Sequence, residues 1–127
     1  MPNDTNTSRD LFVRDLQTRT TERANVTDDG TEESGLSTRA DAQYVFFYSS
    51  QNKLVPGFDD DQTAIYARDR ETRTTSVVSD PVAAHRETAF DPVITPDARH
   101  IAFNSSSDKL VPDDTNGDQD IFVRTRD

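Results

Sequence analysis

The sequence contains no cysteine and no tryptophan, only four glycines, and few large apolar residues. The lack of cysteine excludes disulfide bonds, thiolate catalysis and zinc–thiolate sites. Hydrophobic residues make up 31% of the chain, and no segment approaches the roughly 18 apolar positions that a membrane helix requires. Residues 1–20 lack the apolar region of a signal peptide, so none is predicted. The fold must therefore rest on short apolar segments within a polar chain.

Positive charge is also scarce, since 24 acidic residues outnumber 14 basic ones and the net charge is −10. A chain so polar lies near the composition of disordered proteins. Its apolar residues, however, cluster in short β-branched and aromatic blocks that are typical of strands. The negative charge argues against a nucleic-acid partner, because phosphate would be repelled. An acidic surface suits solubility, cation binding or a high-salt habitat.

A six-residue pattern occurs three times, at residues 10–15, 64–69 and 120–125. It reads Asp-Leu-Phe-Val-Arg-Asp, then Ala-Ile-Tyr-Ala-Arg-Asp, then Asp-Ile-Phe-Val-Arg-Thr. Other blocks recur at the same spacing: 41–47 matches 97–103, 54–56 matches 110–112, and 18–21 matches 72–75. Several independent matches at one spacing indicate an internal repeat of about 55 residues.

Each repeat reads as four short strands, and no segment has the periodicity of a helix. The first strand is predicted near 35–39 and 91–95, the second at 44–49 and 100–105, the third at the six-residue pattern, and the fourth at 20–26 and 74–79. Four short strands per repeat are typical of a β-propeller blade. We therefore predict an all-β fold of antiparallel four-stranded blades. One complete blade (35–79) would be flanked by two partial blades (1–27 and 91–127).

The pattern Thr95-Pro96-Asp97, followed by Leu110 to Asn116 and Asp120 to Arg124, resembles the TolB-like, WD40-like β-propeller repeat family. The resemblance covers almost the whole chain. It implies a non-enzymatic scaffold or protein-binding module, often periplasmic or secreted. The family usually has glycine in two turns where this chain has Ala42 and Ala98, and Arg19 and Arg73. Glycine there would supply positive φ, so the turns are expected to be wider or strained.

A propeller closes with roughly four to eight blades, more than this sequence supplies. We therefore expect a fragment of a longer propeller, a chain that self-associates through exposed sheet edges, or an open stack. The predicted partners are further blades or another protein. The alternative is the propeller portion of a larger enzyme, a prolyl-oligopeptidase-like hydrolase whose catalytic domain lies outside this chain.

An acidic loop precedes the last copy of the six-residue pattern. Oxygen-bearing side chains alternate there as calcium ligands do. The pattern is incomplete, because it lacks the glutamate that closes an EF-hand loop. A polar turn, with Asn and Asp capping backbone amides, is the alternative. The candidate metal ligands are Asp114, Asn116, Asp118 and Asp120, with a reduced set at Asp4, Asn6 and Asp10.

No catalytic motif is recognisable, because neither a Gly-x-Ser-x-Gly elbow nor a His-Glu-x-x-His pair occurs. We therefore predict that the chain itself is not an enzyme. Arg14, Arg68 and Arg124 occupy equivalent positions of the repeat. They are expected to pair with carboxylates such as Asp15 and Asp69, and an anion site is the alternative.

Overall fold

The computed structural model describes most of the chain. The described residues are 5, 7–27, 30–31, 36–40, 43–49, 54–56, 63–79, 89–108 and 110–126, with the backbone alone at 36–39 and 90.

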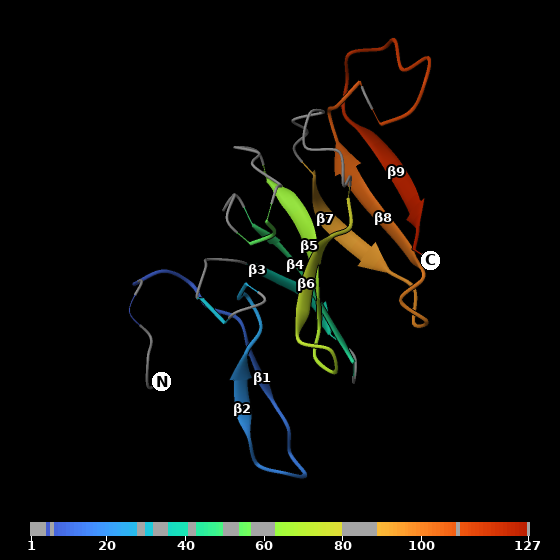
Figure 1. The fold of residues 1–127 in the computed structure, drawn as a ribbon. Helices are drawn as coiled ribbons and strands as arrows, with labels where there is room; N and C mark the ends of the chain where they lie inside the picture. The colour runs from blue at the N-terminus through green and yellow to red at the C-terminus, as the bar shows by residue number, and fades with distance from the viewer. Residues whose placement is uncertain are drawn as a thin grey trace.

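The described strands form three antiparallel sheets, of two, four and three strands (Figure 1). No described residue is helical, which confirms the prediction of an antiparallel all-β chain. The observed strands fall close to the predicted ones. The first sheet is β1 (Phe12–Arg14) and β2 (Thr21–Arg23); the middle sheet is β3 (Leu36–Ala40), β4 (Tyr44–Ser49), β5 (Ala64–Asp69) and β6 (Thr74–Val77); the third sheet is β7 (Ala89–Ile94), β8 (His100–Ser105) and β9 (Asp120–Thr125).

The fourth strand of each repeat, β2 or β6, ends sooner than the sequence pattern predicts. Past its end, the side chain of Asn25 accepts a hydrogen bond from Leu11 N–H at 2.8 Å. Ser79 Oγ accepts one from Ile65 N–H in the same way, at 3.2 Å. Both polar side chains are buried. A side-chain oxygen therefore takes the place of a backbone carbonyl, so the regular ladder stops while the chain stays attached.

The middle sheet is buried on both faces. Successive strand residues point to opposite faces, yet Val45, Phe46 and Phe47 are all at most 1% exposed. Such a continuous apolar run is typical of a strand covered on both sides. The middle sheet therefore separates two apolar cores.

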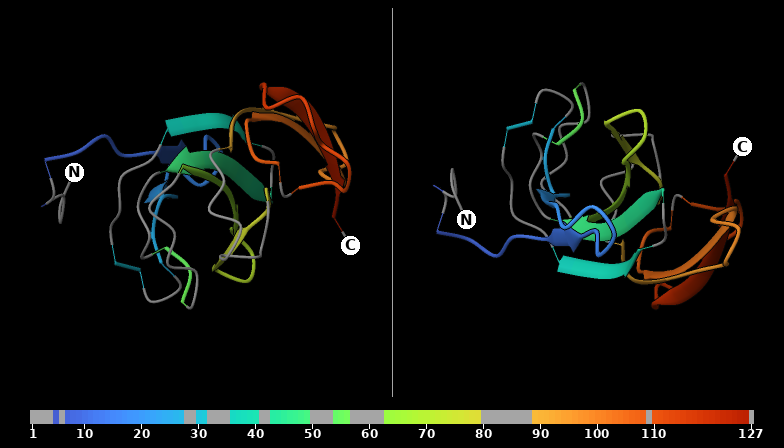
Figure 2. Two further views of the ribbon diagram at one scale, coloured as in Figure 1. Left: turned by 90° about the horizontal axis from the view of Figure 1, so that it is seen from above. Right: turned by 90° about the horizontal axis from the view of Figure 1, so that it is seen from below.

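The larger core lies between the middle and third sheets. Phe46, Ile65 and Ala67 cover one face of the middle sheet, and Ile101 and Phe103 of the third sheet belong to the same buried cluster. β7 contacts β3, β4 and β5. In the views from above and from below, the third sheet lies to one side of the middle sheet (Figure 2). Consecutive repeats are thus packed sheet against sheet.

The smaller core lies on the opposite face of the middle sheet. Phe47 and Tyr66 are fully buried there, and their rings stack with centroids 5.6 Å apart. Leu11, next to β1, packs against this cluster. Leu11 is the repeat equivalent of Ile65, which packs toward the third sheet. The first sheet thus packs on the middle sheet through the same repeat position that the middle sheet uses to pack on the third sheet.

The two described hairpin turns after the third strand are alike in detail. Asp15 Oδ1 accepts hydrogen bonds from the N–H groups of Gln17 and Thr18, at 2.8 and 2.9 Å. Asp69 Oδ1 accepts the equivalent pair from Glu71 and Thr72, at 2.9 and 3.1 Å. Such aspartate side chains fix a turn by satisfying its free amides. The sequence repeat is therefore a repeat of turn geometry too.

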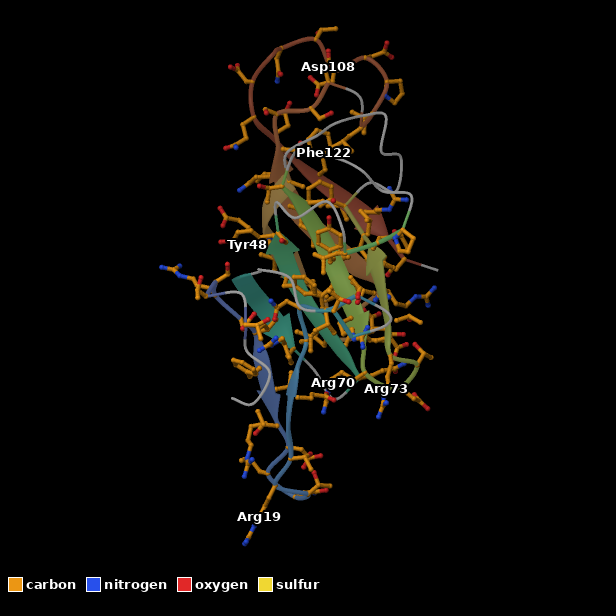
Figure 3. All side chains as sticks on the ribbon, turned by 60° about the vertical axis from the view of Figure 1, so that its left-hand side comes forward. Arg19, Tyr48, Arg70, Arg73, Asp108 and Phe122 are labelled. Carbon is orange, nitrogen blue, oxygen red and sulfur yellow. The ribbon has the colours of Figure 1, made fainter. Side chains whose placement is uncertain are left out.

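Left-handed backbone occurs at turn residues that are not glycine, among them Arg19, Arg73 and Ala98. Arg19, Arg73 and Ala98 have φ of 58°, 59° and 57°. Arg19 lies at the outer tip of the β1–β2 hairpin and Arg73 at the β5–β6 turn (Figure 3). A side chain in this conformation costs about 1–2 kcal/mol. These turns keep the geometry that glycine favours, without glycine. Ala42, the fourth such position, lies outside the described residues.

Candidate functional site

A hollow of about 470 Å³ opens where the last acidic loop meets β9. Its lining combines carboxylates with apolar side chains. Ile121 and Val123 on β9 are 75% and 69% exposed, which is unusual for large apolar residues of a strand. We call this feature the acidic hollow. Its main lining residues are Val111, Asp113, Asp114, Asp120, Ile121 and Val123.

The loop beside the hollow is held by its own side chains. Asn116 Oδ1 accepts a hydrogen bond from Asp118 N–H at 2.9 Å. The amide nitrogen of Asn116 donates to Asp120 Oδ2 at 3.1 Å. Gly117 supplies the positive φ of 68° that the bend requires. The loop thus has the hydrogen bonds of a polar turn, the alternative to a calcium site.

The other predicted calcium ligands in this loop are not gathered round one point. Asp118 is exposed and Asp114 is partly buried in the wall of the hollow. Within the described ranges, no three His, Cys, Asp or Glu side chains are placed to hold a metal ion together. Calcium binding by Asp114, Asn116, Asp118 and Asp120 therefore stays a prediction.

The reduced metal set of the first repeat falls partly outside the structure, because Asp4 and Asn6 are not among the described residues. Asp10 belongs to the β1–β2 hairpin network. Its Oδ2 lies 3.3 Å from Arg23 Nη2, and its Oδ1 accepts a hydrogen bond from Asn25 Nδ2 at 3.1 Å. Asp10 thus joins the two strands of the first sheet.

Arg14 and Arg68 do not pair with Asp15 and Asp69, the neighbouring aspartates that the sequence suggested as partners; their side-chain partners on the adjacent strand are threonines. Arg14 Nη1 donates to Thr21 Oγ1 at 2.8 Å, and Arg68 Nη1 donates to Thr75 Oγ1 at 3.1 Å. Adjacent strand residues point to opposite faces, so each arginine is turned away from the aspartate after it. The aspartate is held instead by the amides of its hairpin turn.

Two of these arginines connect consecutive sheets. Arg68 Nη1 also donates to the carbonyl oxygen of Thr27 at 3.3 Å, after β2. Arg124 Nη1 donates to the carbonyl oxygen of Ser79 at 3.4 Å, after β6. Each arginine thus reaches the segment that follows the fourth strand of the preceding sheet. Their role in the structure is to position neighbouring sheets.

Hydrogen bonding lowers the pKa of three aspartates at turns. The amides of Thr18 and Gln17 lower the pKa of Asp15, and the hydroxyl of Thr95 with the amide of Arg99 lowers that of Asp97. Partial burial raises the pKa of Asp69, but hydrogen bonds from Thr72, Glu71 and Gln43 outweigh it and the pKa is lowered. Bonds to the charged form favour ionisation. All three carboxylates therefore fix turns.

A second hollow, of about 370 Å³, lies between the first and middle sheets. Arg68, Arg70 and Arg73 line it with Glu22 and Arg23. Arg70 pairs with Glu22, and Arg23 pairs with Asp10, so acidic groups balance two of these charges. The linear sequence did not indicate this cluster, because its members come from different repeats and meet only in the fold.

Comparison of the chain with models of protein families, with characterised proteins and with solved structures finds no match. In the described part of the chain, no helix has the length and apolar character needed to cross a membrane.

Proposed function

We propose that this chain is a non-catalytic module of the β-propeller type that acts as a scaffold and binds protein. The two-, four- and three-stranded sheets would be a partial blade (1–27), a complete blade (35–79) and a partial blade (91–127). The observation that carries the proposal is the repeated direction of packing. The face of the middle sheet with Ile65 packs on the third sheet, and Leu11, its equivalent in the first repeat, packs on the middle sheet.

Polar contacts between the repeats support the same arrangement. Arg70 and Arg126 are equivalent residues just after the third strand, and both reach the preceding sheet. Arg70 pairs with Glu22 on β2, whereas the Arg126 guanidinium lies 4.6 Å from the ring centroid of Tyr44 on β4. An arginine at the same repeat position thus reaches the preceding sheet in both cases, although its partners differ, as expected of units that contact their neighbours in a stack. Propellers are built by such radial repetition of four-stranded sheets.

The acidic hollow is the surface we assign to protein binding. Exposed Ile121 and Val123 form an apolar floor, and Asp113, Asp114 and Asp120 give it an acidic rim. An apolar centre with a charged rim suits a protein segment that carries both apolar and basic side chains. The chain's net charge of −10 disfavours nucleic acid on this surface.

The stacking is tested by a double-mutant cycle between Ile65 and Phe103, which belong to one buried cluster but to different sheets. We expect the two alanine substitutions to be non-additive by about 0.5–3 kcal/mol in the free energy of unfolding. A matched cycle between Ile65 and Val93 should be additive, because Val93 is 67% exposed on the opposite face of the third sheet. Additivity in both cycles would remove the basis of the propeller proposal.

The binding role is tested with defined probes. Fluorescence anisotropy would compare an extended peptide of alternating valine and arginine with a duplex DNA, each at low and high salt. We expect the peptide to bind, more weakly at high salt, and the DNA not to bind. Ile121→Asp should abolish peptide binding, and a fluorophosphonate probe for activated serines should leave the chain unlabelled. DNA binding or covalent labelling would contradict the proposal.

A further inference from the structure

The outer edge of β9 differs from the equivalent edges of β1 and β5. In the first sheet β2 pairs with β1, and in the middle sheet β6 pairs with β5. The third sheet has the order β7-β8-β9, and no described residue pairs with β9 on the side away from β8. Unpaired backbone groups along a strand edge can accept another strand.

The other two repeats show which bonds this edge can make. Leu11 donates its N–H to Asn25 Oδ1, and its carbonyl oxygen accepts from Ala24 N–H at 2.8 Å. Ile65 donates its N–H to Ser79 Oγ, and its carbonyl oxygen accepts from Val78 N–H at 2.8 Å. The third equivalent residue is Ile121. Strand alternation directs its N–H and carbonyl groups to the open edge.

A third bond of the set involves the repeated arginine. Arg14 and Arg68 donate to threonines on β2 and β6, and Arg68 also reaches the preceding sheet. Arg124 makes the contact to the preceding sheet, through the carbonyl oxygen of Ser79. A threonine on a strand added beside β9 would complete the same arrangement for Arg124.

These three bonds define a short pattern of partner residues. The supplying segments are Thr21-Glu22-Arg23-Ala24-Asn25 and Thr75-Ser76-Val77-Val78-Ser79. Both read threonine, two variable residues, a small apolar residue, and then asparagine or serine. The threonine meets the arginine, the apolar residue donates its N–H, and the last side chain accepts from the strand.

We infer that the β9 edge binds an extended segment with the pattern Thr-x-x-Ala/Val-Asn/Ser, supplied by a protein partner and added as a fourth strand. The inference rests on the proposed protein-binding role and names its partner by chemistry. Ile121 and Val123 lie along this edge and in the floor of the acidic hollow, so basic residues beside the pattern would meet the acidic rim. Addition of a strand to a sheet edge is a common mode of peptide recognition.

The test uses the whole chain and a blocked synthetic peptide with the sequence of Thr72–Ser79. This peptide carries the pattern and one arginine, and it has no acidic side chain. We expect saturable binding by isothermal titration calorimetry. Hydrogen exchange should show the amides of Ile121 and Val123 becoming protected, whereas amides of β1 should not change.

Two control peptides distinguish recognition of the pattern from nonspecific binding. Val78→Pro in the peptide removes the N–H meant for the carbonyl oxygen of Ile121, and Ser79→Ala removes the acceptor for its N–H. We expect the first change to weaken binding about tenfold or more and the second about threefold to tenfold. Equal affinities of the three peptides would overturn the inference. Because the protein is the same in all three measurements, a loss of affinity cannot come from misfolding of the protein.

A matched pair of protein variants locates the site. By the same alternation as Ile121, Val123 directs its N–H to the open edge, so Val123→Pro removes a donor there, and proline is tolerated at an edge. We expect at least a tenfold weaker peptide affinity, whereas Val93→Thr, at a 67% exposed valine on β7 at the other edge of the same sheet, should stay within about twofold. If the chain self-associates without peptide and Val123→Pro dissociates it, the β9 edge binds a second copy of the chain, and the inference of a separate protein partner is overturned. Failure of the pattern peptide, together with binding of the valine–arginine peptide, would leave the proposed function standing.

Discussion

The middle and third sheets carry the same sequence pattern but bury it differently. Ile65 and Ala67 of β5 are 0% and 2% exposed, whereas their equivalents Ile121 and Val123 on β9 are 75% and 69% exposed. In the middle sheet this face is covered by the third sheet. No described sheet covers it in the third. Burial is therefore set by what packs on a residue, and equivalent residues differ because their neighbours differ.

Truncating the two equivalent isoleucines tests most directly whether their different burial has different energetic consequences. Ile65→Ala should lower the free energy of unfolding by about 2–5 kcal/mol, because it empties part of a closed core. Ile121→Ala should change it by no more than about 0.5 kcal/mol, since its side chain is mostly in solvent. Urea unfolding of both variants measures the difference. Equal losses would mean that β9 is covered in solution.

The strained turns give a smaller effect of opposite sign. Arg73→Gly should raise the free energy of unfolding by about 0.5–1 kcal/mol, because glycine adopts its positive φ without steric cost. The control is Glu71→Gly in the same turn, where φ is not positive and glycine should destabilise. Loss of stability in Arg73→Gly would show that the arginine side chain contributes more than the strain.

The pH dependence of the free energy of unfolding should distinguish the middle sheet from the third, because Asp69 is titratable and its equivalent in the third sheet is Thr125. The folded-state pKa of Asp69 is lowered, so its contribution is present above the pKa of the unfolded chain. That contribution is lost as the pH falls from the ordinary aspartate value through the folded pKa. Asp69→Asn should therefore reduce the acid sensitivity of unfolding, whereas Thr125→Ser should not. Acid unfolding curves that are identical for the unmodified chain and for Asp69→Asn would contradict this role of Asp69.

Calcium should give the smallest effect, confined to the loop of the third repeat. Binding to the folded chain alone would raise Tm by mass action. Melting curves at low salt, in calcium and in EDTA, measure it, with Asp118→Asn as the variant and Asp15→Asn as a control in a turn. A calcium-dependent rise that is lost in Asp118→Asn would confirm the predicted site. Coincident curves would leave the loop as the polar turn that Asn116 forms.

Much of the fold could be predicted from the sequence, because strand signals are local. The six-residue pattern placed β5 and β9 correctly, since β-branched and aromatic blocks bounded by polar turns favour strands. The absence of glycine at Arg19 and Arg73 led us to expect wider or strained turns, and both residues have the positive φ that is strained for a residue with a side chain. The role of Asn25 and Ser79 was not visible in the pattern, because each accepts a hydrogen bond from the N–H of a residue 14 positions earlier.

The candidate site was predictable only in part. The alternation of Asp and Asn located the acidic loop, but its hydrogen bonds depend on how the loop bends at Gly117. The ion pair of Arg70 with Glu22 joins residues from different repeats, so no spacing rule could indicate it. Arg14 and Arg68 do not pair with Asp15 and Asp69, because neighbours along a strand face opposite sides.

By itself, the sequence determined the repeat, the strand positions, the antiparallel all-β class and the turns, since each depends on local propensity and a two-residue alternation. Only the tertiary structure decided which face of each sheet is covered, because packing between sheets depends on residues distant in sequence. It buries Ile65, exposes Ile121 and leaves an edge of β9 open beside an acidic loop. Those nonlocal contacts give equivalent positions of the repeat different surroundings.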